Sequence, residues 1–547
     1  MMKSQYIILL CKVVVLASIS LQTCAYAAPD KSSSVTSPQQ QQKPNIVWLF
    51  SDDHAYQAIG AYGGRLESMN ITPNIDRIAN EGMRFDKAYV ANSICGPSRA
   101  TLLTGKHSHL NGKTHNRSPF DHNQAQFQKT LQQNGYQTAM IGKIHLSGKM
   151  QGFDYWEVLP GQGRYIDPEF ITEQGKVTYQ NEHSTEVITK RALNWLDSSR
   201  DESKPFMLMV HYKAPHRAWT PTKHWQEKFK NLTFPEPDTL FDDYSGRGTA
   251  AHHQAMSIAD SMHMTKDLKA NQSPRKEYLA KHNLTGKDLV RWKYQTYMRD
   301  YLACVAGVDE GVGELLDYLA KQGLDKNTIV MYSSDQGFYL GEHGWFDKRM
   351  MYEESFRTPL VARWPGEISP GSVNTDLVQN IDFAETFLAL AGVDAPKDMQ
   401  GESLVPLFKG KTPANWRKQL YYHYWEYPGA HDVRRHEGVA SKRFKLIRFY
   451  GKDVPNNEEW ELYDLEKDPQ ELKSEYNNPE YRAEIMRLKK DLAKLRAQYQ
   501  VVDLPQVDLR PKHKQKHKKK NRLQPVKLMR LKALVLAKVT YSTGVLT

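Results

Sequence analysis

Four short, almost entirely apolar segments constrain the fold of this chain more than any other feature. They cover residues 45–51, 138–141, 206–211 and 328–333. Continuous apolar runs of this length are typical of strands buried on both faces of a parallel sheet. Stretches with helical character lie near them, at 127–134, 184–198, about 293–322 and 381–391, and Thr72-Pro73-Asn74 opens a further helix. This alternation predicts an α/β fold in which helices cover both faces of a mixed sheet.

The character of the chain changes after Leu407. Segments 419–425, 438–450 and 459–465 have the composition of strands and predict a small antiparallel sheet. A helix is expected at about 478–499, with an apolar stripe that could cover this sheet, formed by Ile485, Leu488, Leu492 and Leu495. We therefore predict a large domain at 44–415 and a smaller α+β subdomain at 416–509. The segment 220–290 is polar and is predicted to be an irregular insertion.

The N-terminus resembles an export signal. Residues 1–28 combine Lys3, a largely apolar run and a small-residue cleavage site at Ala25-Tyr26-Ala27, and a linker rich in Ser, Gln and Pro follows at 29–43. Lys12 interrupts the apolar run, so a stable membrane span is not expected. We predict export to the periplasm, with secretion and lipid anchoring at Cys24 as alternatives.

The formal net charge of +12 comes largely from one end of the chain, because residues 511–547 are rich in Lys and Arg and contain no acidic residue. The segment 510–547 is predicted to be a solvated basic tail. Nucleic-acid binding is not expected for an exported chain whose basic run lacks interleaved aromatic residues. The four cysteines lie at positions 11, 24, 95 and 304. Two belong to the signal, which excludes a disulfide framework.

The segment 95–105 reads Cys-Gly-Pro-Ser-Arg-Ala-Thr-Leu-Leu-Thr-Gly. Pro97 suits the first turn of a helix, which places Cys95 at the helix N-terminus, where free N–H groups attract anions. Arg99 adds a permanently charged fork suited to an oxyanion such as sulfate or phosphate. This pattern predicts an anion site with a reactive side chain at its entrance.

Acidic side chains follow two of the predicted strands at their carboxyl ends, where open α/β sheets bind ligands. Asp52 and Asp53 come directly after the first strand, and Asp335 and Gln336 follow the strand at 328–333. Adjacent carboxylates repel one another unless a cation lies between them, and oxygen ligands are preferred by hard divalent metals. The sequence therefore predicts a metal site at this edge.

Cys95-x-Pro-Ser-Arg99 followed by Leu-Thr-Gly resembles the signature of the type I sulfatases, in which this cysteine is oxidised to formylglycine. Further landmarks similar to this family lie at Thr72–Arg77 and Leu462–Leu465, so the resemblance spans roughly residues 45–500. It implies an alkaline-phosphatase-like α/β core with a C-terminal antiparallel subdomain. It also implies a maturation enzyme, either formylglycine-generating or radical, as a partner.

The resemblance assigns roles to specific residues. The implied metal ligands are Asp52, Asp53, Cys95, Asp335 and Gln336, with Ca²⁺ expected and Mg²⁺ as the alternative. The implied catalytic residues are Cys95, Arg99, Lys143, His145, His216 and Lys348. In this scheme the hydrated formylglycine attacks sulfur, the cations neutralise the sulfuryl oxygens, His216 protonates the departing oxygen and His145 helps to expel sulfate. His211 and Arg349 are neighbours that could be mistaken for His216 and Lys348, and His343 is a weaker candidate.

We therefore predict a sulfatase that hydrolyses sulfate esters on a sulfated oligo- or polysaccharide. The segment 335–354 is similar to bacterial sulfatases assigned to N-acetylglucosamine-6-sulfate, whereas algal polysaccharides remain alternatives. A phosphonate or phosphodiester hydrolase of the same superfamily would share the nucleophile and the metal. A third alternative is a non-catalytic protein that binds anionic polysaccharides.

Overall fold

The computed structural model describes residues 43–510, so the predicted signal, most of the linker and the basic tail lie outside the described residues. The four apolar segments form neighbouring parallel strands at the centre of a ten-stranded sheet, in the order β9-β1-β8-β4. Their bounds are β1 (Asn45–Ser51), β4 (Gln137–Lys143), β8 (Phe206–His211) and β9 (Thr328–Ser334). The prediction of a buried parallel centre is confirmed.

Shorter strands extend this sheet on both sides and make it mixed. Beyond β9 lie β12 (Leu360–Arg363), β2 (Met83–Phe85) and β13 (Ser372–Asn374); beyond β4 lie β5 (Tyr155–Leu159), β6 (Glu169–Thr172) and β7 (Gly175–Thr178). Strand β12 runs antiparallel to both of its neighbours, and so does β6. The sequence does not predict these strands, because each is only three to five residues long and such runs carry little periodic signal.

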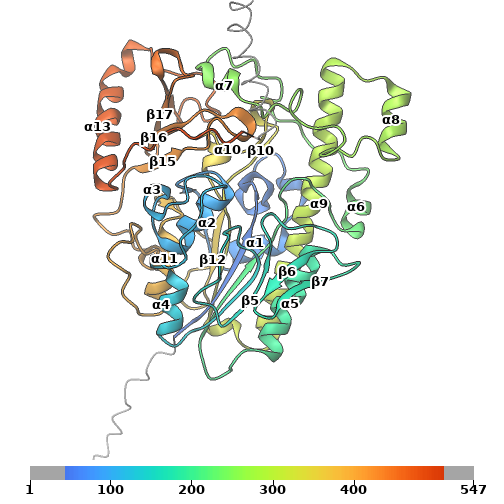
Figure 1. Ribbon diagram of the computed structural model, residues 1–547, viewed down its shortest axis with the longest axis vertical. Helices are drawn as coiled ribbons and strands as arrows, with labels where there is room; N and C mark the ends of the chain where they lie inside the picture. Colours follow the sequence, from blue (N-terminus) through green and yellow to red (C-terminus); the bar gives the residue numbers. More distant parts are fainter. Residues whose placement is uncertain (1–42, 511–547) are drawn as a thin grey trace, which may run out of the picture. The chain divides into compact units, whose positions relative to one another are not determined.

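Helices cover both faces of the sheet (Figure 1). One face carries α1 (Pro73–Asn80), α5 (Ser184–Ser198) and α9 (Gly286–Lys321), and the other carries α2 (Cys95–Thr104), α4 (Phe127–Gln133) and α11 (Asp382–Leu390). Strand β1 shows why this arrangement forms. Its alternate residues Val47 and Leu49 belong to the first core, and Trp48 and Phe50 belong to the second. A strand that is apolar on both sides requires two covering layers.

The segment 220–290 is not irregular throughout, which corrects the prediction. It contains α6 (Lys223–Phe229), α7 (Thr249–His253) and α8 (Arg275–His282), and α9 begins at Gly286, earlier than expected. Helix α6 packs on α9. The sequence lacked a helical signal here because these helices are short and α8 buries none of its residues, so no apolar stripe is present.

The smaller sheet near the C-terminus is antiparallel, in the order β15-β16-β17-β18. Its strands are β15 (Leu420–Tyr424), β16 (His436–Ala440), β17 (Phe444–Tyr450) and β18 (Glu458–Asp464). The single strand predicted at 438–450 is a hairpin, because the chain turns at Ser441, whose N–H donates to the carbonyl of Phe444 at 2.8 Å. Helix α13 (Arg482–Gln498) covers one face with Leu488, Leu492 and Leu495, as the apolar stripe predicts.

The other face of this small sheet packs against the larger part of the chain. Tyr422 and Tyr463 share an apolar cluster with Trp345, Met350 and Met351, which lie beyond the carboxyl end of β9. A continuous core therefore crosses the predicted boundary at 415/416, and this boundary stays a prediction.

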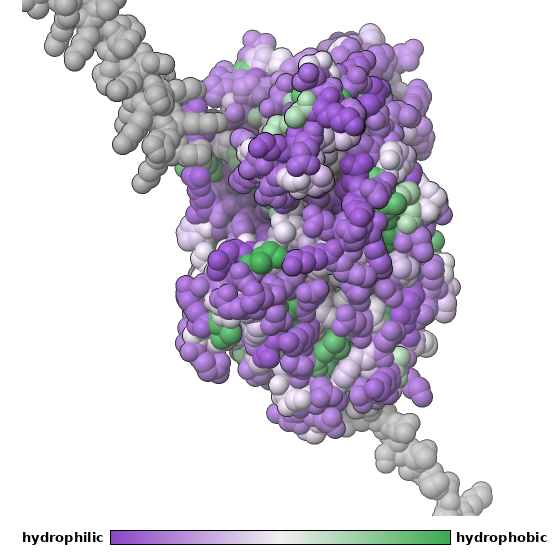
Figure 2. Space-filling model, turned by 90° about the vertical axis from the view of Figure 1, so that its right-hand side faces the viewer, coloured by the Kyte–Doolittle hydropathy of each residue, from purple (hydrophilic) through white to green (hydrophobic). Residues whose placement is uncertain are grey.

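The remaining elements are short. They are the paired strands β3 (Ala88–Tyr89) with β14 (Val378–Gln379) and β10 (Tyr339–Leu340) with β11 (Phe346–Asp347), and the helices α3 (Ser108–Asn111), α10 (Glu353–Phe356) and α12 (Val405–Phe408). Within the described range, no helix combines the length and apolar character needed to cross a bilayer. The face seen in Figure 2 is mostly hydrophilic, with only small, scattered apolar areas.

Candidate active site

The site begins where β1 and β9 end side by side. The two strands are parallel and in register up to Ser51 and Ser334, so the residues that follow them meet at one edge of the sheet. The backbone N–H of Asp53 donates to Asp335 Oδ1 at 3.0 Å. Tyr301 of α9 fixes the chain after β1, because its hydroxyl donates to the Asp53 carbonyl at 2.7 Å. The register of the sheet therefore brings together two acidic segments about 280 residues apart, as the sequence analysis predicted.

Asp52, Asp53 and Asp335 form a buried cluster of carboxylates. Each is at most 1% exposed, and one oxygen from each lies within 4.8 Å of the others. Burial raises the pKa of Asp53 to about 6, although the ammonium group of Lys348 opposes this shift. Three carboxylates at such short separations require positive charge nearby. They therefore define a site for cations.

Cationic side chains neutralise this cluster one by one. Lys143 pairs with Asp52, Lys348 pairs with Asp53, and Arg99 Nε donates to Asp335 Oδ2 at 3.0 Å. All three cations are buried. Each is one of the residues that the sequence analysis predicted to contact an anion.

Gln336 completes the cluster and points to a further cation. Its Nε2 donates to Asp53 Oδ1 at 2.5 Å and to Asp335 Oδ1 at 2.7 Å. Its own Oε1 is buried without a hydrogen-bond donor, and so are Asp52 Oδ1 and Asp53 Oδ2. A half-turn of the amide would exchange its oxygen and nitrogen and add a neutral oxygen to those of the three carboxylates. This set of oxygen ligands fits a hard divalent metal.

Cys95 lies at the first position of α2, next to the carboxylates. Its thiol is 1% exposed, and Lys348 Nζ lies 3.2 Å from Sγ. Burial raises the pKa of the thiol to about 12, and Lys348 offsets only part of this effect. An unmodified Cys95 is therefore protonated at neutral pH and is a poor nucleophile.

Helix α2 is attached to the segment that follows β9. The Ser98 hydroxyl donates to the Asp335 carbonyl, and Asn380 Nδ2 donates to Ser98 Oγ at 2.9 Å. Arg99 spans the gap to β4, because it donates to the Lys143 carbonyl in addition to the Asp335 carboxylate. These bonds hold the N-terminus of α2 over the carboxylate cluster.

Lys143 and His145 reach the site from β4, although not by simple alternation. The strand ends at Lys143, and His145 has a φ of 54°, so the chain is not extended at His145. His145 nevertheless lies among cations. Burial lowers its pKa well below the usual value, and the charges of Lys143 and Arg99 lower it further. His145 is therefore neutral at pH 7, with an Nδ1 that has no hydrogen-bond partner among the described residues.

The structure separates the histidines that the sequence could not. His216 Nε2 lies 3.8 Å from Asp53 Oδ2, whereas the His211 ring packs on Trp48 and Phe50 in the core. His343 is buried, and its Nδ1 lies 2.9 Å from Arg247 Nη1 and 3.1 Å from Asp242 Oδ2. His216 alone of the three lies at the carboxylate cluster.

The same distinction holds for Lys348 and Arg349. Lys348 contacts Asp53 and Cys95, whereas the Arg349 guanidinium pairs with Asp347. The structure thus brings all the predicted site residues together at one edge of the sheet. Their chemical roles stay predictions.

Three polar residues at the site were not predicted. Gln162 accepts a hydrogen bond from Lys143, Lys113 lies beside Gly96, and Lys213 is a buried lysine near Tyr165. None belongs to a local motif. Lys213 is only three residues before His216, and its position just beyond β8 was the one available signal.

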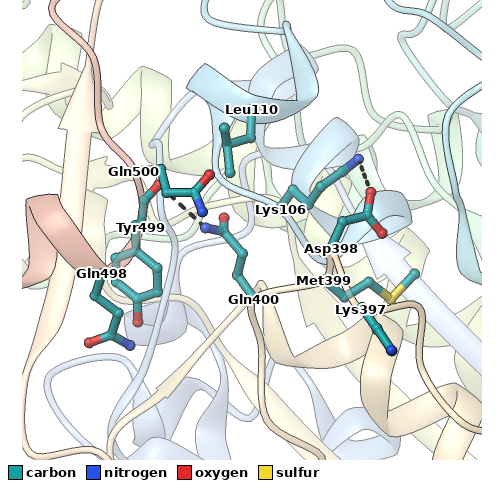
Figure 3. Close-up of a pocket in the computed structure, with 9 residues that line it drawn as sticks. All are labelled: Lys106, Leu110, Lys397, Asp398, Met399, Gln400, Gln498, Tyr499 and Gln500. Atoms are coloured by element: carbon teal, nitrogen blue, oxygen red, sulfur yellow. Dashed lines mark hydrogen bonds and ion pairs between the residues drawn. The ribbon is translucent and has the colours of Figure 1, made fainter.

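A second hollow lies apart from this centre (Figure 3). It has a volume of about 600 Å³ and is formed by Lys106 after α2, Leu110 of α3, the segment 397–400 and residues 498–500. An ion pair between Lys106 and Asp398, at 2.9 Å, spans part of its wall. None of the predicted site residues lines it, so it is not the site built above.

Comparison with known families identifies the class. The chain belongs to the sulfatase family: the family model "Sulfatase" matches residues 44–393, and the model "N-sulphoglucosamine sulphohydrolase, C-terminal" matches residues 341–498. The chain is therefore a sulfuric ester hydrolase, and the predicted alkaline-phosphatase-like architecture is confirmed.

Individual relatives are informative as well. The chain is 47% identical over 520 residues to an N-acetylglucosamine-6-O-sulfatase of Bacteroides thetaiotaomicron, which covers 88% of this chain and 90% of the relative. It is 28% identical to the human N-acetylglucosamine-6-sulfatase over 409 residues, covering 70% and 67%. A solved structure described as a complex with its substrate D-glucosamine-2-N,6-O-disulfate matches with a TM-score of 0.80 and 47% identity, covering 84% of this chain and 98% of that one.

Proposed function

We propose that this sulfatase removes 6-O-sulfate groups from glucosamine-type sugars of sulfated glycans. The observation that carries the proposal is the position of Cys95, at the N-terminus of α2 and 3.2 Å from Lys348, beside three buried carboxylates. The sugar and the position of the sulfate are supported by the names of the two relatives and by the sulfated glucosamine in the similar solved structure.

The proposal includes formylglycine at position 95 and a divalent metal, Ca²⁺ in preference to Mg²⁺. Asp52, Asp53, Asp335 and Gln336 would hold the metal, and the buried oxygens without donors support this assignment. Together the two groups would supply a hydroxyl nucleophile for sulfur at neutral pH, which the buried Cys95 thiol cannot do.

The charges of the cluster explain why three cations lie here. In the structure, Lys143, Lys348 and Arg99 balance the three carboxylates. A divalent cation on the carboxylates would leave positive charge on these side chains for the oxygens of a sulfate ester. Preorganised cations of this kind stabilise negative charge that develops in a transition state.

The two histidines at the site supply proton transfer. His216 lies close to Asp53 and would deliver a proton to the oxygen of the departing sugar; because burial and the charges of Lys143 and Lys348 lower its pKa well below the usual value, it would first have to take up that proton. His145 is neutral and has a free ring nitrogen, so it can accept a proton during release of sulfate. The proton donor and the proton acceptor therefore lie in the segments that follow two different strands, β8 and β4.

Export to the periplasm and processing by a maturation enzyme belong to the same proposal. The residues that carry the export signal lie outside the described residues, so this part rests on the sequence alone. Secretion and lipid anchoring remain its alternatives.

The first experiment is peptide mass spectrometry across residue 95, on protein co-expressed with a maturation enzyme, together with sulfate release from N-acetylglucosamine-6-sulfate. We expect a mass loss of about 18 Da, the difference between cysteine and formylglycine, and no turnover by Cys95→Ala. Unmodified cysteine, with hydrolysis of phosphonate or phosphate diesters instead of sulfate esters, would contradict the proposal.

A further inference from the structure

A strongly basic cavity adjoins the carboxylate cluster. It has a volume of about 480 Å³ and lies between the segment 162–166, the segment 213–220 and Lys266. Arg164, Lys213, Arg217 and Lys266 line it, and no Asp or Glu does. The roles proposed above for sulfate hydrolysis use none of these four residues.

The cavity shares a wall with the site. His216 lines the cavity, while its Nε2 lies 3.8 Å from Asp53 Oδ2 and within 4.8 Å of the Cys95 sulfur. Gln162 also lines it and accepts a hydrogen bond from Lys143. A sugar whose leaving oxygen is next to His216 would therefore extend into this cavity.

The cations of the cavity differ in what they are free to bind. Arg217 is already neutralised, because its Nε and Nη2 donate to both oxygens of Asp267 at 2.7 and 2.6 Å. Lys213 is 4% exposed, its Nζ lies 4.6 Å from the centre of the Tyr165 ring, and this ammonium group makes no hydrogen bond or ion pair with any described residue, although the Asp53 carboxylate acts on it from a distance. A buried ammonium group that lacks a directly paired anion is unfavourable.

Arg164 and Lys266 add two more charges at the exposed side of the cavity. Both side chains are exposed, and neither forms an ion pair within the described part of the chain. Three cations without counter-ions therefore face one cavity, with the most buried of them nearest to the Tyr165 ring. An anion is the ligand that matches this distribution of charge.

We propose that this cavity is a subsite for a second anionic group of the substrate, held by Lys213, Arg164 and Lys266, so that the enzyme favours glucosamine sugars with a second sulfate or a neighbouring carboxylate. This inference rests on the function proposed above and specifies the substrate further. Charge-assisted hydrogen bonds to sulfate or carboxylate are the interactions that these side chains offer.

The test compares kcat/KM for N-acetylglucosamine-6-sulfate, glucosamine-2-N,6-O-disulfate, and a disaccharide that carries one 6-sulfate and a uronic acid. Variants are Lys213→Met, which keeps the length and apolar stem, and the exposed pair Arg164→Gln with Lys266→Gln. Lys326→Gln is the matched control, since it removes an exposed lysine without an ion pair, next to the start of β9 at the opposite end of that strand.

We expect the doubly charged substrates to lose about tenfold in kcat/KM, mainly through KM, in each cavity variant. In the exposed pair variant the singly charged sugar should change less than about twofold, and the control should change neither substrate. If kcat/KM falls only for the disulfate, the ligand of the cavity is a sulfate on the same sugar. If it falls only for the disaccharide, the ligand is the carboxylate of the uronic acid. If Lys213→Met does not fold, the exposed pair decides the result.

Equal effects on singly and doubly charged substrates, or none on either, would overturn the subsite. If the wild-type enzyme releases sulfate from none of these sugars, the proposed function fails separately. The subsite is then tested by calorimetry with glucosamine-2-N-sulfate, which should bind to the wild type and not to the exposed pair variant. Failure to bind to the wild type would overturn the subsite as well.

Discussion

At the scale of single residues, Lys348 is the most informative position of the site. It contacts both the Asp53 carboxylate and the Cys95 sulfur, whereas the neighbouring Arg349 is occupied by Asp347. Burial opposes the charged form of Lys348, but Asp53 and Cys95 raise the pKa above its usual value, so the charge is retained.

We therefore expect Lys348→Ala to lower kcat on a sulfate ester by about 10²- to 10³-fold, since one preorganised charge is removed. The loss should appear in kcat more than in KM, measured by steady-state sulfate release. Lys326→Ala, at an exposed position before β9, is the control. A variant that kept wild-type kcat would show that Lys348 is structural.

Glu385 of α11 makes stability depend on pH, away from the site. Burial, and then the charge of Asp382, raise its pKa to about 8 from a usual 4.5. The unfolded chain therefore loses this proton first as pH rises, and the folded protein loses stability between about pH 4.5 and 8.

Glu385→Gln removes this titration. We expect the variant to gain stability relative to wild type as pH rises from 5 to 8, by up to about 1.4 kcal/mol per pH unit, in denaturant titrations at several pH values. Glu402→Gln, which removes an exposed carboxylate nearby, is the control. A difference that stayed constant with pH would contradict the buried, protonated state of Glu385.

At the scale of elements, the end of β4 depends on one glycine. Gly142 has a φ of 106°, and a Cβ there would lie 2.0 Å from the carbonyl oxygen of His211 on β8. Gly135, just before β4, also has a positive φ of 87°, but no atom lies within 4 Å of its added Cβ. The two positions separate backbone strain from steric contact.

Gly135→Ala should cost about 1 kcal/mol from the left-handed backbone alone. Gly142→Ala should cost about 3 kcal/mol or more, because β4 and β8 must also move apart. Because Lys143 follows directly, Gly142→Ala should also reduce turnover, whereas Gly135→Ala should not. Chemical denaturation and kcat/KM measure both effects, and equal losses of stability would refute the steric argument.

The sequence predicts helices and strands correctly where an apolar pattern continues over more than a few residues. The buried strands β1 and β8 were found at their observed bounds, since each is a continuous apolar run with polar residues only at its ends. The hairpin at Ser441 was not found, and neither were the short strands β2 and β12, because runs of three or four residues carry no periodicity. The predicted site residues belong to recognisable motifs. Gln162 and Lys213 do not, and only the folded chain brings them next to the site.

At the scale of the whole molecule, the site joins β1, β4, β8 and β9 with α2, so a bound cation would link much of the fold. A metal that binds only the native state stabilises it by about 2.7 kcal/mol at 100 times its Kd. We expect chelation to lower the melting temperature and added Ca²⁺ to restore it more effectively than Mg²⁺. The variant Asp52→Asn should respond less, and a wild-type protein whose melting ignores chelator and Ca²⁺ would contradict the metal assignment.

Helix α2 is buried along its entire length, and Cys95 at its first position is only 1% exposed. Once the chain has folded, no enzyme of ordinary size can reach Cys95 without unfolding this helix. If Cys95 is oxidised as proposed, this reaction would have to precede folding, and a molecule that folded first would keep an inactive thiol. The fraction of active protein in a preparation would then depend on the ratio of the oxidation rate to the folding rate. Treating native and denatured protein with the same maturation enzyme would test this, since only the denatured protein should be modified.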